Sequence, residues 1–310
     1  MTDINQTYFN LLQQTLLRGR QSVNERTKHG VRTAIGAQFV KVHLDAGKLP
    51  IPGNRRYFPH IAAAEAAWQT LGTLDADFIM RYAPKLWGKF LVDGQVPAAY
   101  GYRWSDSFGR NQIELAIDAL MNDPTNRQVY VSTWDPRCDG LGEPNQPPNI
   151  PCLVGFALNV IGDALHMSVM VRSSDLFVGL PYDIMCYAFT LDMLAAELNL
   201  KPGALSFMLA NAHLYETHWT MTEACVSERV DSLSGYELKK YADSIKADTA
   251  WVTQLRRWAP NASIEPQLPA WSWSEVKANP HGYIEHVKRL GLRAYSPNWH
   301  GWNPLPEVVV

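Results

Sequence analysis

Apolar residues recur at helical spacing in three segments of the chain, which we expect to be helices: residues 62–71, 111–121 and 184–198. The third segment is apolar along most of its length, which is typical of a helix that packs inside a core. Lys-Pro-Gly at residues 201–203 is expected to end it. Residues 1–25 mix polar and apolar positions and are expected to form a helical N-terminal extension.

Short runs rich in β-branched and other apolar residues lie between these helices, and we expect them to be strands: residues 31–44, 129–134, 152–160, 164–172 and 204–209. Ile-Gly-Asp at 161–163 predicts a hairpin between the third and fourth runs, and the Pro/Gly/Asn-rich residues 135–151 predict a long loop. With neither a repeat nor a linker, the pattern predicts one α+β domain over residues 1–310.

Composition and charge narrow the class of protein. The chain has 310 residues, of which 46% are hydrophobic, and a net charge of −2. This charge argues against a surface that grips nucleic acid through its phosphates. The four cysteines lack metal-ligand spacing, so neither a metal site nor a disulfide framework is expected. No apolar stretch approaches the roughly 20 residues of a membrane span. We therefore expect a cytoplasmic protein without a membrane anchor.

Cys152 is the first candidate for chemistry, because it follows the proline-rich loop and opens a predicted strand. Taken alone, a free cysteine in this position is more often a buried structural residue than a nucleophile. A reactive thiolate needs a cationic neighbour. Arg172, at the end of the second hairpin strand, could return beside Cys152. An ion pair with Asp175 is the plainer explanation of that arginine.

Two later elements also carry polar side chains that could meet a ligand. Asp183 is expected in the first turn of the third helix, where a carboxylate that compensates the helix dipole is the simplest explanation. His213 and Tyr215 lie two residues apart and therefore share one face of an extended segment. A pair of buried structural residues explains them equally well.

The order of these elements resembles the thymidylate synthase family. The family has a Pro-Cys, an Arg-Ser-x-Asp-x-x-x-Gly-x-Pro-Phe-Asn-Ile and a His-x-Tyr, which are similar here to residues 151–152, 172–184 and 213–215. Its Tyr-Gly-x-x-Trp, Asn-Asp-Pro-x-x-Arg-Arg and Asp-Arg-Thr elements resemble residues 100–104, 122–128 and 25–27. The match is collinear from about Arg26 to Tyr215, which makes it specific.

The resemblance implies a thymidylate synthase-type α+β fold, with mixed sheets covered by helices and a homodimer formed through a sheet face. It implies that the Cys152 thiolate attacks C6 of a pyrimidine nucleoside monophosphate. The one-carbon unit would come from 5,10-methylenetetrahydrofolate as cosubstrate, without a metal.

The resemblance also implies a role for each matched residue. Catalytic roles fall to Cys152, Glu65, Tyr100 and Asp183. The nucleotide would be bound by Arg26, Arg127, Arg172, Ser173, Asp175, Asp183, His213 and Tyr215, with Arg127 contributed across the dimer interface. Folate would contact Trp87, Asp175, Gly179 and Tyr182.

The departures from the family pattern suggest the substrate. The family reads uracil with an Asn, and this chain has Asp183, which suits the N4 amino group and N3 of cytosine. The same change occurs in the cytidylate hydroxymethylases. Further departures are Gln128 for the second arginine, Leu153 for a histidine, Ala157 for a glutamine, and a short tail after residues 302–306.

These departures lead to an expected function and two alternatives. We expect 5-hydroxymethylation of dCMP or CMP with release of tetrahydrofolate. The first alternative is 5-methylation of cytidylate or deoxyuridylate with release of dihydrofolate. A non-catalytic relative that binds nucleotide or RNA is the second alternative, and the presence of Cys152, Arg172 and His213 argues against it.

Overall fold

The larger β-sheet forms where the sequence alternates apolar and polar positions. The computed structural model describes residues 4–44, 47–52, 57–142, 146–226, 235–236, 239–240 and 267–294. The sheet has the order β3-β8-β6-β5-β4, with bounds Gln38–His43, Lys201–Leu209, Ala164–Val171, Leu153–Ile161 and Tyr130–Ser132. Strands β6 and β8 run parallel and the other neighbours antiparallel, so the sheet is mixed. The expected hairpin is β5–β6.

A smaller sheet joins segments that lie far apart in the sequence. Its order is β1-β2-β9-β7, with bounds Arg20–Val23, Gly30–Thr33, Ala212–Tyr215 and Ser174–Asp175. Strands β7 and β9 run parallel, and their register places Asp175 beside His213. Two of the polar residues expected at the site are therefore neighbours in one sheet.

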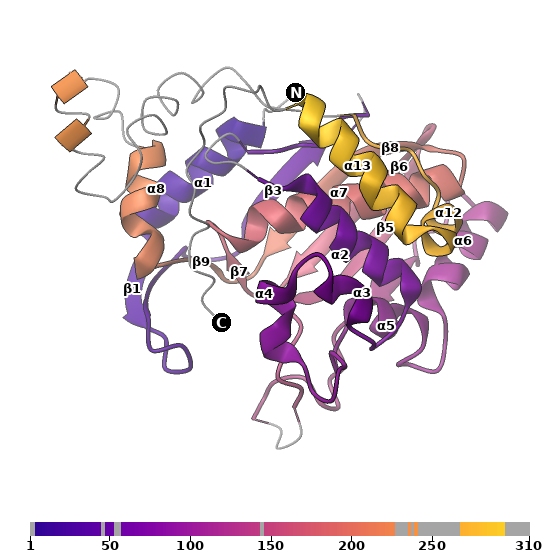
Figure 1. Ribbon diagram of the computed structural model, residues 1–310, viewed down its shortest axis with the longest axis horizontal. Helices are drawn as coiled ribbons and strands as arrows, with labels where there is room; N and C mark the ends of the chain where they lie inside the picture. Colours follow the sequence, from indigo (N-terminus) through magenta and orange to yellow (C-terminus); the bar gives the residue numbers. More distant parts are fainter. Residues whose placement is uncertain are drawn as a thin grey trace.

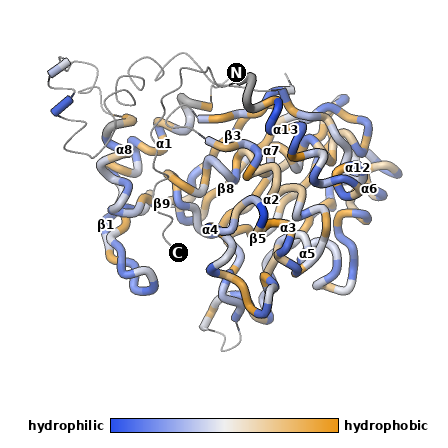
Figure 2. Tube along the Cα trace, in the orientation of Figure 1, coloured by the Kyte–Doolittle hydropathy of each residue, from blue (hydrophilic) through white to orange (hydrophobic). Residues whose placement is uncertain are grey.

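The helices lie in successive layers over the larger sheet. Helix α7 (Gly179–Glu197) packs on β6 and β8 and is buried along almost its whole length. Helix α2 (Pro59–Leu71) covers α7, and α13 (Pro280–Ala294) packs on α2 in turn, as Figure 1 shows. A fully buried helix must be apolar on all sides, which explains the composition of α7. In Figure 2 the loop between β1 and β2 is, by contrast, hydrophilic.

Shorter helices complete the fold around these layers. Helix α1 (Ile4–Arg18) packs against α8 (Trp219–Val226), and α12 (Trp273–Ala278) packs against α2 and α7. The other helices with described bounds are α3 (Asp77–Met80), α4 (Pro84–Trp87), α5 (Tyr100–Ser105) and α6 (Gln112–Asn122), with 3-10 turns at Gly88–Phe90 and Glu216–His218. The α+β fold with mixed sheets under helices is thus confirmed. No described helix is long and apolar enough to span a membrane.

Three expectations about individual elements were wrong. The N-terminal helix ends at Arg18 rather than near residue 25, and residues 20–23 form an edge strand. Helix α1 also buries Tyr8 and Leu12 in the core, so it is no appendage. Residues 201–203 open β8 instead of ending a helix. Helix α7 begins at Gly179, which puts Asp183 beyond its first turn.

The larger sheet has an exposed apolar face, and its β4 edge is hydrogen-bonded to a side chain. Its outer face exposes apolar side chains from three strands: Phe39 of β3, Met170 of β6 and Tyr130 of β4. At the β4 edge, the Gln112 amide donates to Ser132 O at 2.9 Å and accepts from Ser132 N at 2.8 Å. The side chain of Gln112 thus satisfies the backbone of an edge strand as a neighbouring strand would.

Candidate active site

Cys152 lies at the end of the long loop, immediately before β5. Its backbone N–H donates to the Tyr100 hydroxyl at 3.2 Å, and its carbonyl accepts from Arg172 N at 2.9 Å. The side chain is exposed. The hairpin therefore returns Arg172 beside Cys152, as the sequence predicted, and the thiol is available to a ligand.

The Arg172 guanidinium holds the loop rather than a carboxylate. Its Nε donates to Pro151 O at 2.8 Å, a terminal nitrogen donates to Ile150 O at 3.1 Å, and the group lies 5.6 Å from the centre of the Trp134 ring. Asp175 accepts instead from the backbone N–H groups of residues 177 and 178. The contacts of these described residues thus do not include the alternative ion pair between Arg172 and Asp175.

Opposing effects set the pKa of the Cys152 thiol. Surrounding protein desolvates the thiolate and raises this pKa, while Arg172 and Arg26 lower it and Asp183 raises it further. The net direction is upward, so the two cations only partly offset the desolvation. The residue is exposed, yet the protein around it desolvates the thiol, and the positive charge beside it limits the cost of ionisation.

Two carboxyl groups approach each other where α2 meets α7. Desolvation raises the pKa of Glu65 to about 7, and the Trp87 indole offsets part of that shift. Desolvation also raises the pKa of Asp183 well above its usual range, with Glu65 and then Asp175 adding to the effect. A carboxyl whose pKa is raised in this way keeps its proton to a higher pH and can then donate a hydrogen bond. The pair therefore offers both donors and acceptors.

Three residues that the sequence did not single out complete this side of the site. Tyr187 and Cys186 lie one turn beyond Asp183, and the charges of Asp183 and Glu65 raise the pKa values of both, after desolvation. Trp134 lies under Arg172. Helical spacing from Asp183 was the signal that could have identified Tyr187, whereas its apolar context suggested only a core position.

The smaller sheet gathers the residues expected to meet phosphate and sugar. His213 and Tyr215 pack with ring centres 5.0 Å apart, and the His213 Nδ1 lies 3.1 Å from Asn211 Oδ1. Desolvation lowers the His213 pKa and so favours the neutral ring, while the charge of Asp175 opposes this effect. Arg26 is exposed and lies close enough to influence Cys152, His213 and Tyr215. One polar rim thus joins the nucleophile to the smaller sheet.

The other expected residues lie around this group at different distances. Tyr182 packs edge-on against Tyr57, and Gly179 begins α7. Ser173 lies half-buried between β6 and β7. Arg127 is exposed on the segment before β4, and it is not among the charges that act on the Cys152 thiol. The short tail at 302–310 lies outside the described residues.

The site residues described above do not form a metal-binding group. Within the described ranges, no group of three His, Cys, Asp or Glu side chains could hold a metal ion. None of the four cysteines is in a disulfide. A surface groove does lie between α6 and β4, yet its lining shares only Trp134 with the site. The chemistry of the site therefore rests on a thiol, two carboxyls with raised pKa values, a tyrosine and arginines.

Comparison with known proteins agrees with this arrangement. The family model described as thymidylate synthase matches residues 6–269. A thymidylate synthase of Corynebacterium aurimucosum is 28% identical over 223 residues, which cover 70% of this chain and 80% of that relative. The family match spans the thiol, the carboxyl pair and the arginines of the polar rim. The chain therefore belongs to the thymidylate synthase family, whose members transfer a one-carbon unit from 5,10-methylenetetrahydrofolate to C5 of a pyrimidine nucleotide.

Proposed function

We propose that this enzyme hydroxymethylates C5 of a cytidine monophosphate, either dCMP or CMP. The observation that carries the proposal is the Asp183 carboxyl, which lies in desolvated surroundings beside Glu65 and has a raised pKa. A neutral carboxyl donates one hydrogen bond and accepts another. That pattern matches N3 and the N4 amino group of cytosine, whereas the ionised carboxylate, which can only accept, would face the accepting O4 of uracil. A mismatched buried polar pair is strongly rejected.

The nucleotide would be held along the polar rim. Arg26 and Arg172 are proposed to bind its phosphate, because arginine presents paired donors to phosphate oxygens. His213 and Tyr215 are proposed to bind the sugar, with Ser173 and Asp175 beside them. With the phosphate held there, C6 of the base would face the Cys152 sulfur, whose attack forms the covalent adduct.

A second copy of the chain would complete the phosphate site. Arg127 is exposed and does not act on the Cys152 thiol of its own chain, which suits donation to a partner. The outer face of the larger sheet, with Phe39, Met170 and Tyr130, offers an apolar surface for that dimer. Exposed apolar residues gathered on one face are typical of an interface. Gln128 leaves one fewer arginine for the phosphate than the family pattern has.

The cosubstrate would lie against the wall that α2, α4 and the start of α7 form. The Trp87 indole is buried beside the Glu65 carboxyl and lowers its pKa, so this ring and that carboxyl are proposed to form one edge of the cosubstrate site. Tyr182, Gly179 and Asp175 are proposed as further contacts. When bound, the folate supplies the one-carbon unit. Glu65 and Tyr100 are proposed to move protons through water at the base.

The fate of the one-carbon unit decides between products. Addition of water to the exocyclic methylene, followed by release of Cys152, gives 5-hydroxymethylcytidylate and tetrahydrofolate without net oxidation. Addition of hydride gives 5-methylcytidylate and dihydrofolate, which is the alternative. Leu153 and Ala157 support hydroxymethylation, because they replace the polar residues that organise water on the uracil side in the family.

The test is to incubate the purified enzyme and 5,10-methylenetetrahydrofolate separately with CMP, dCMP and dUMP. Mass spectrometry of each product should show addition of CH₂O to a cytidylate. Absorbance should show no dihydrofolate. A CH₂ addition with rising dihydrofolate absorbance would establish methylation instead, and preference for dUMP would overturn the assignment of Asp183.

A further inference from the structure

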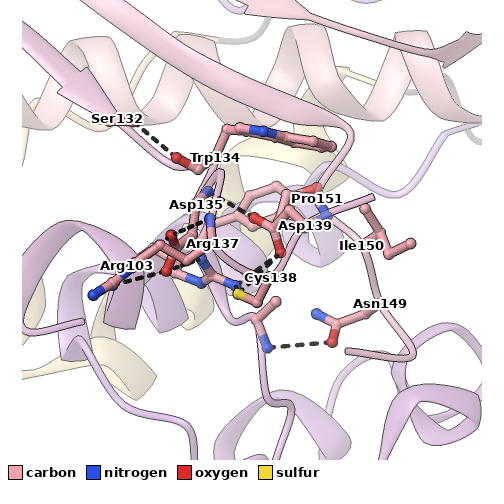
Figure 3. Close-up of polar contacts among 12 residues, drawn as sticks. Arg103, Ser132, Trp134, Asp135, Arg137, Cys138, Asp139, Asn149, Ile150 and Pro151 are labelled. Atoms are coloured by element: carbon pink, nitrogen blue, oxygen red, sulfur yellow. Dashed lines mark hydrogen bonds and ion pairs between the residues drawn. The ribbon is translucent and has the colours of Figure 1, made fainter. Parts of the chain in front are cut away.

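The loop that carries Cys152 is held at its C-terminal end by hydrogen bonds to three residues outside the loop. The Tyr100 hydroxyl accepts from Cys152 N at 3.2 Å, and Arg172 donates to the carbonyls of residues 150 and 151. The Asn149 side-chain oxygen accepts from Ala98 N at 3.2 Å. Figure 3 shows Asn149, Ile150 and Pro151 in this stretch. A loop without regular structure needs such contacts to hold a nucleophile still.

A buried ionic cluster fastens the other end of the same loop. Arg103 donates to Asp139 Oδ1 at 3.0 Å and lies 3.6 Å from Asp135 Oδ2. The second oxygen of Asp139 accepts from Asp135 N at 2.7 Å. The Arg103 side chain is 4% exposed and that of Asp139 0%. Figure 3 shows Arg103 directed at these carboxylates.

The positive and negative charges of this ionic cluster are equal in number. Arg137 binds both oxygens of Asp135 at 2.9 Å from the solvent side, so two arginines face two carboxylates. These contacts hold the pKa of Asp135 down at about 2. A buried charge without such partners would be strongly unfavourable. The charges of the cluster are therefore balanced at neutral pH, although Arg103 Nη1 reaches Asp135 only at ion-pair distance, and the cluster lies in the first turn of the loop.

Both ends of the loop are attached to one short helix. Tyr100 and Arg103 lie three residues apart on α5 and so project from the same side of it. Tyr100 contacts the nucleophile's backbone, whereas Arg103 contacts residues 135–139, and Ala98 precedes the helix. A shift of α5 relative to the start of the loop is thereby transmitted to Cys152.

We propose that Arg103, through Asp139 and Asp135, is a positioning residue that fixes the Cys152 loop for attack on the nucleotide. Arg103 is buried and its contacts are with the loop rather than with the thiol, so it acts through the loop. The inference concerns the geometry of the nucleophile and rests on the proposed function only for the identity of the nucleotide. A misplacement of about 1 Å in a reacting group can lower a rate about 100-fold.

The principal test compares Asp139→Asn, Arg103→Lys and a control, Lys201→Met. The asparagine would keep the shape and an acceptor but remove a charge, and the lysine would keep the charge but not the two-pronged contact. Lys201 pairs with Asp163 at 2.6 Å on the exposed hairpin, so its loss removes an ion pair outside the loop. Turnover is measured with whichever nucleotide the wild-type enzyme converts.

For Asp139→Asn, we expect kcat per native molecule to fall about 10- to 100-fold while KM for the nucleotide changes less than about threefold. Arg103→Lys should lose less than Asp139→Asn, and Lys201→Met should match the wild type. Native protein is quantified by circular dichroism before each assay. A kcat within twofold of the wild type for Asp139→Asn, or equal changes in kcat and KM, overturns the proposal.

A second measurement needs neither nucleotide nor folate, so it stands even if the proposed function fails. Iodoacetamide alkylation of Cys152 is followed against pH by peptide mass mapping, which separates it from Cys138. A loosened loop hydrates the thiolate, so the midpoint for Asp139→Asn should fall toward the ordinary value of about 8.5. Unfolded molecules also alkylate with an ordinary midpoint, so the comparison uses protein whose native fraction equals that of the wild type by circular dichroism. An unchanged midpoint contradicts the proposal.

Discussion

The helical side and the loop side of the site are built in opposite ways. Glu65 projects from α2 among five buried alanines (residues 62–64, 66 and 67), which let α2 approach α7 closely. Cys152 instead ends a loop held by hydrogen bonds and ion pairs. Close apolar packing excludes water and raises the pKa of a carboxyl. A thiol that must ionise needs polar neighbours and access to its substrate. The carboxyl and the thiol therefore lie in surroundings that suit their different chemistry.

The largest expected effect tests the loop side directly. Cys152→Ser should lower turnover about 1,000-fold or more, because a hydroxyl is a much weaker nucleophile at neutral pH. The side chain is exposed and its hydrogen bonds are made by the backbone, so stability should change by less than about 0.5 kcal/mol. Product formation and thermal midpoint are measured together. Turnover that survives this change would remove Cys152 from the reaction.

The second prediction tests whether Asp183, on the helical side, determines which pyrimidine base is bound. Asp183→Asn should lower the preference for cytidylate over deoxyuridylate, measured as a ratio of kcat/KM, by roughly 100- to 10,000-fold. The amide reverses the donor and acceptor that face the base. Asp192→Asn is the matched control, because Asp192 lies on the same helix but accepts from Ala270 N at 2.9 Å. An unchanged ratio in Asp183→Asn would separate this residue from base recognition.

The third prediction uses the pKa of Glu65 to measure how far water is excluded from the helical side. A carboxyl whose folded pKa is about 7, against 4.5 unfolded, binds its proton more tightly in the folded protein. Its contribution to stability is complete below pH 4.5 and is lost as pH rises toward 7. Glu65→Gln should abolish this loss, worth at most about 3 kcal/mol at 1.4 kcal/mol per pKa unit.

Urea unfolding of Glu65→Gln and the wild type at pH 5 and pH 8 measures that difference. Asp192 also has a pKa raised to about 7 by burial. Asp192→Asn should therefore flatten the dependence of stability on pH to a similar degree while keeping its activity. Glu65→Gln should lose roughly 100-fold or more in turnover through the lost proton transfer. Parallel stability curves for Glu65→Gln and the wild type would mean that water reaches Glu65 freely.

The smallest effect sharpens the contrast between the two sides. Gln69 lies one turn after Glu65, and its amide makes only long contacts, 3.6 Å to Cys186 Sγ and 3.4 Å from Thr190 Oγ1. Gln69→Leu should cost about 1 kcal/mol in urea unfolding. Turnover should stay within threefold, because packing rather than polar contact holds α2 on α7. A tenfold loss of turnover in folded protein would show that the helical side also depends on polar contacts.

Much of the site could be predicted because its parts lie in order along local elements. The hairpin alone brings Arg172 back to Cys152, and alternation along β9 puts His213 and Tyr215 together. The cluster of Arg103 and Asp139 could not be found, since its partners are 36 residues apart and the loop has no periodicity. The sequence places Asp183 near the start of α7. Its raised pKa could not be predicted, because it depends on burial and on Glu65, which α2 brings close to it.

The misassigned elements have local physical causes. Pro202 and Gly203 disfavour most strands. They are tolerated in β8 because the pairing of β6 with β8 is irregular there, with a register shift between residues 165 and 167. There the His166 ring occupies the space where a Cβ of Gly203 would lie, and its Nδ1 accepts from Ala204 N at 2.9 Å. Strand β1 was missed because all four of its residues are exposed and show no alternation.

The amide of Gln112 on the edge of β4 has a consequence for the behaviour of this protein at high concentration. An open strand edge is a template for another chain, and fibrous aggregates grow by adding strands there. Gln112 holds both backbone groups of Ser132 and so closes that template. Replacement of this one glutamine by alanine is expected to shorten the shelf life of concentrated solutions.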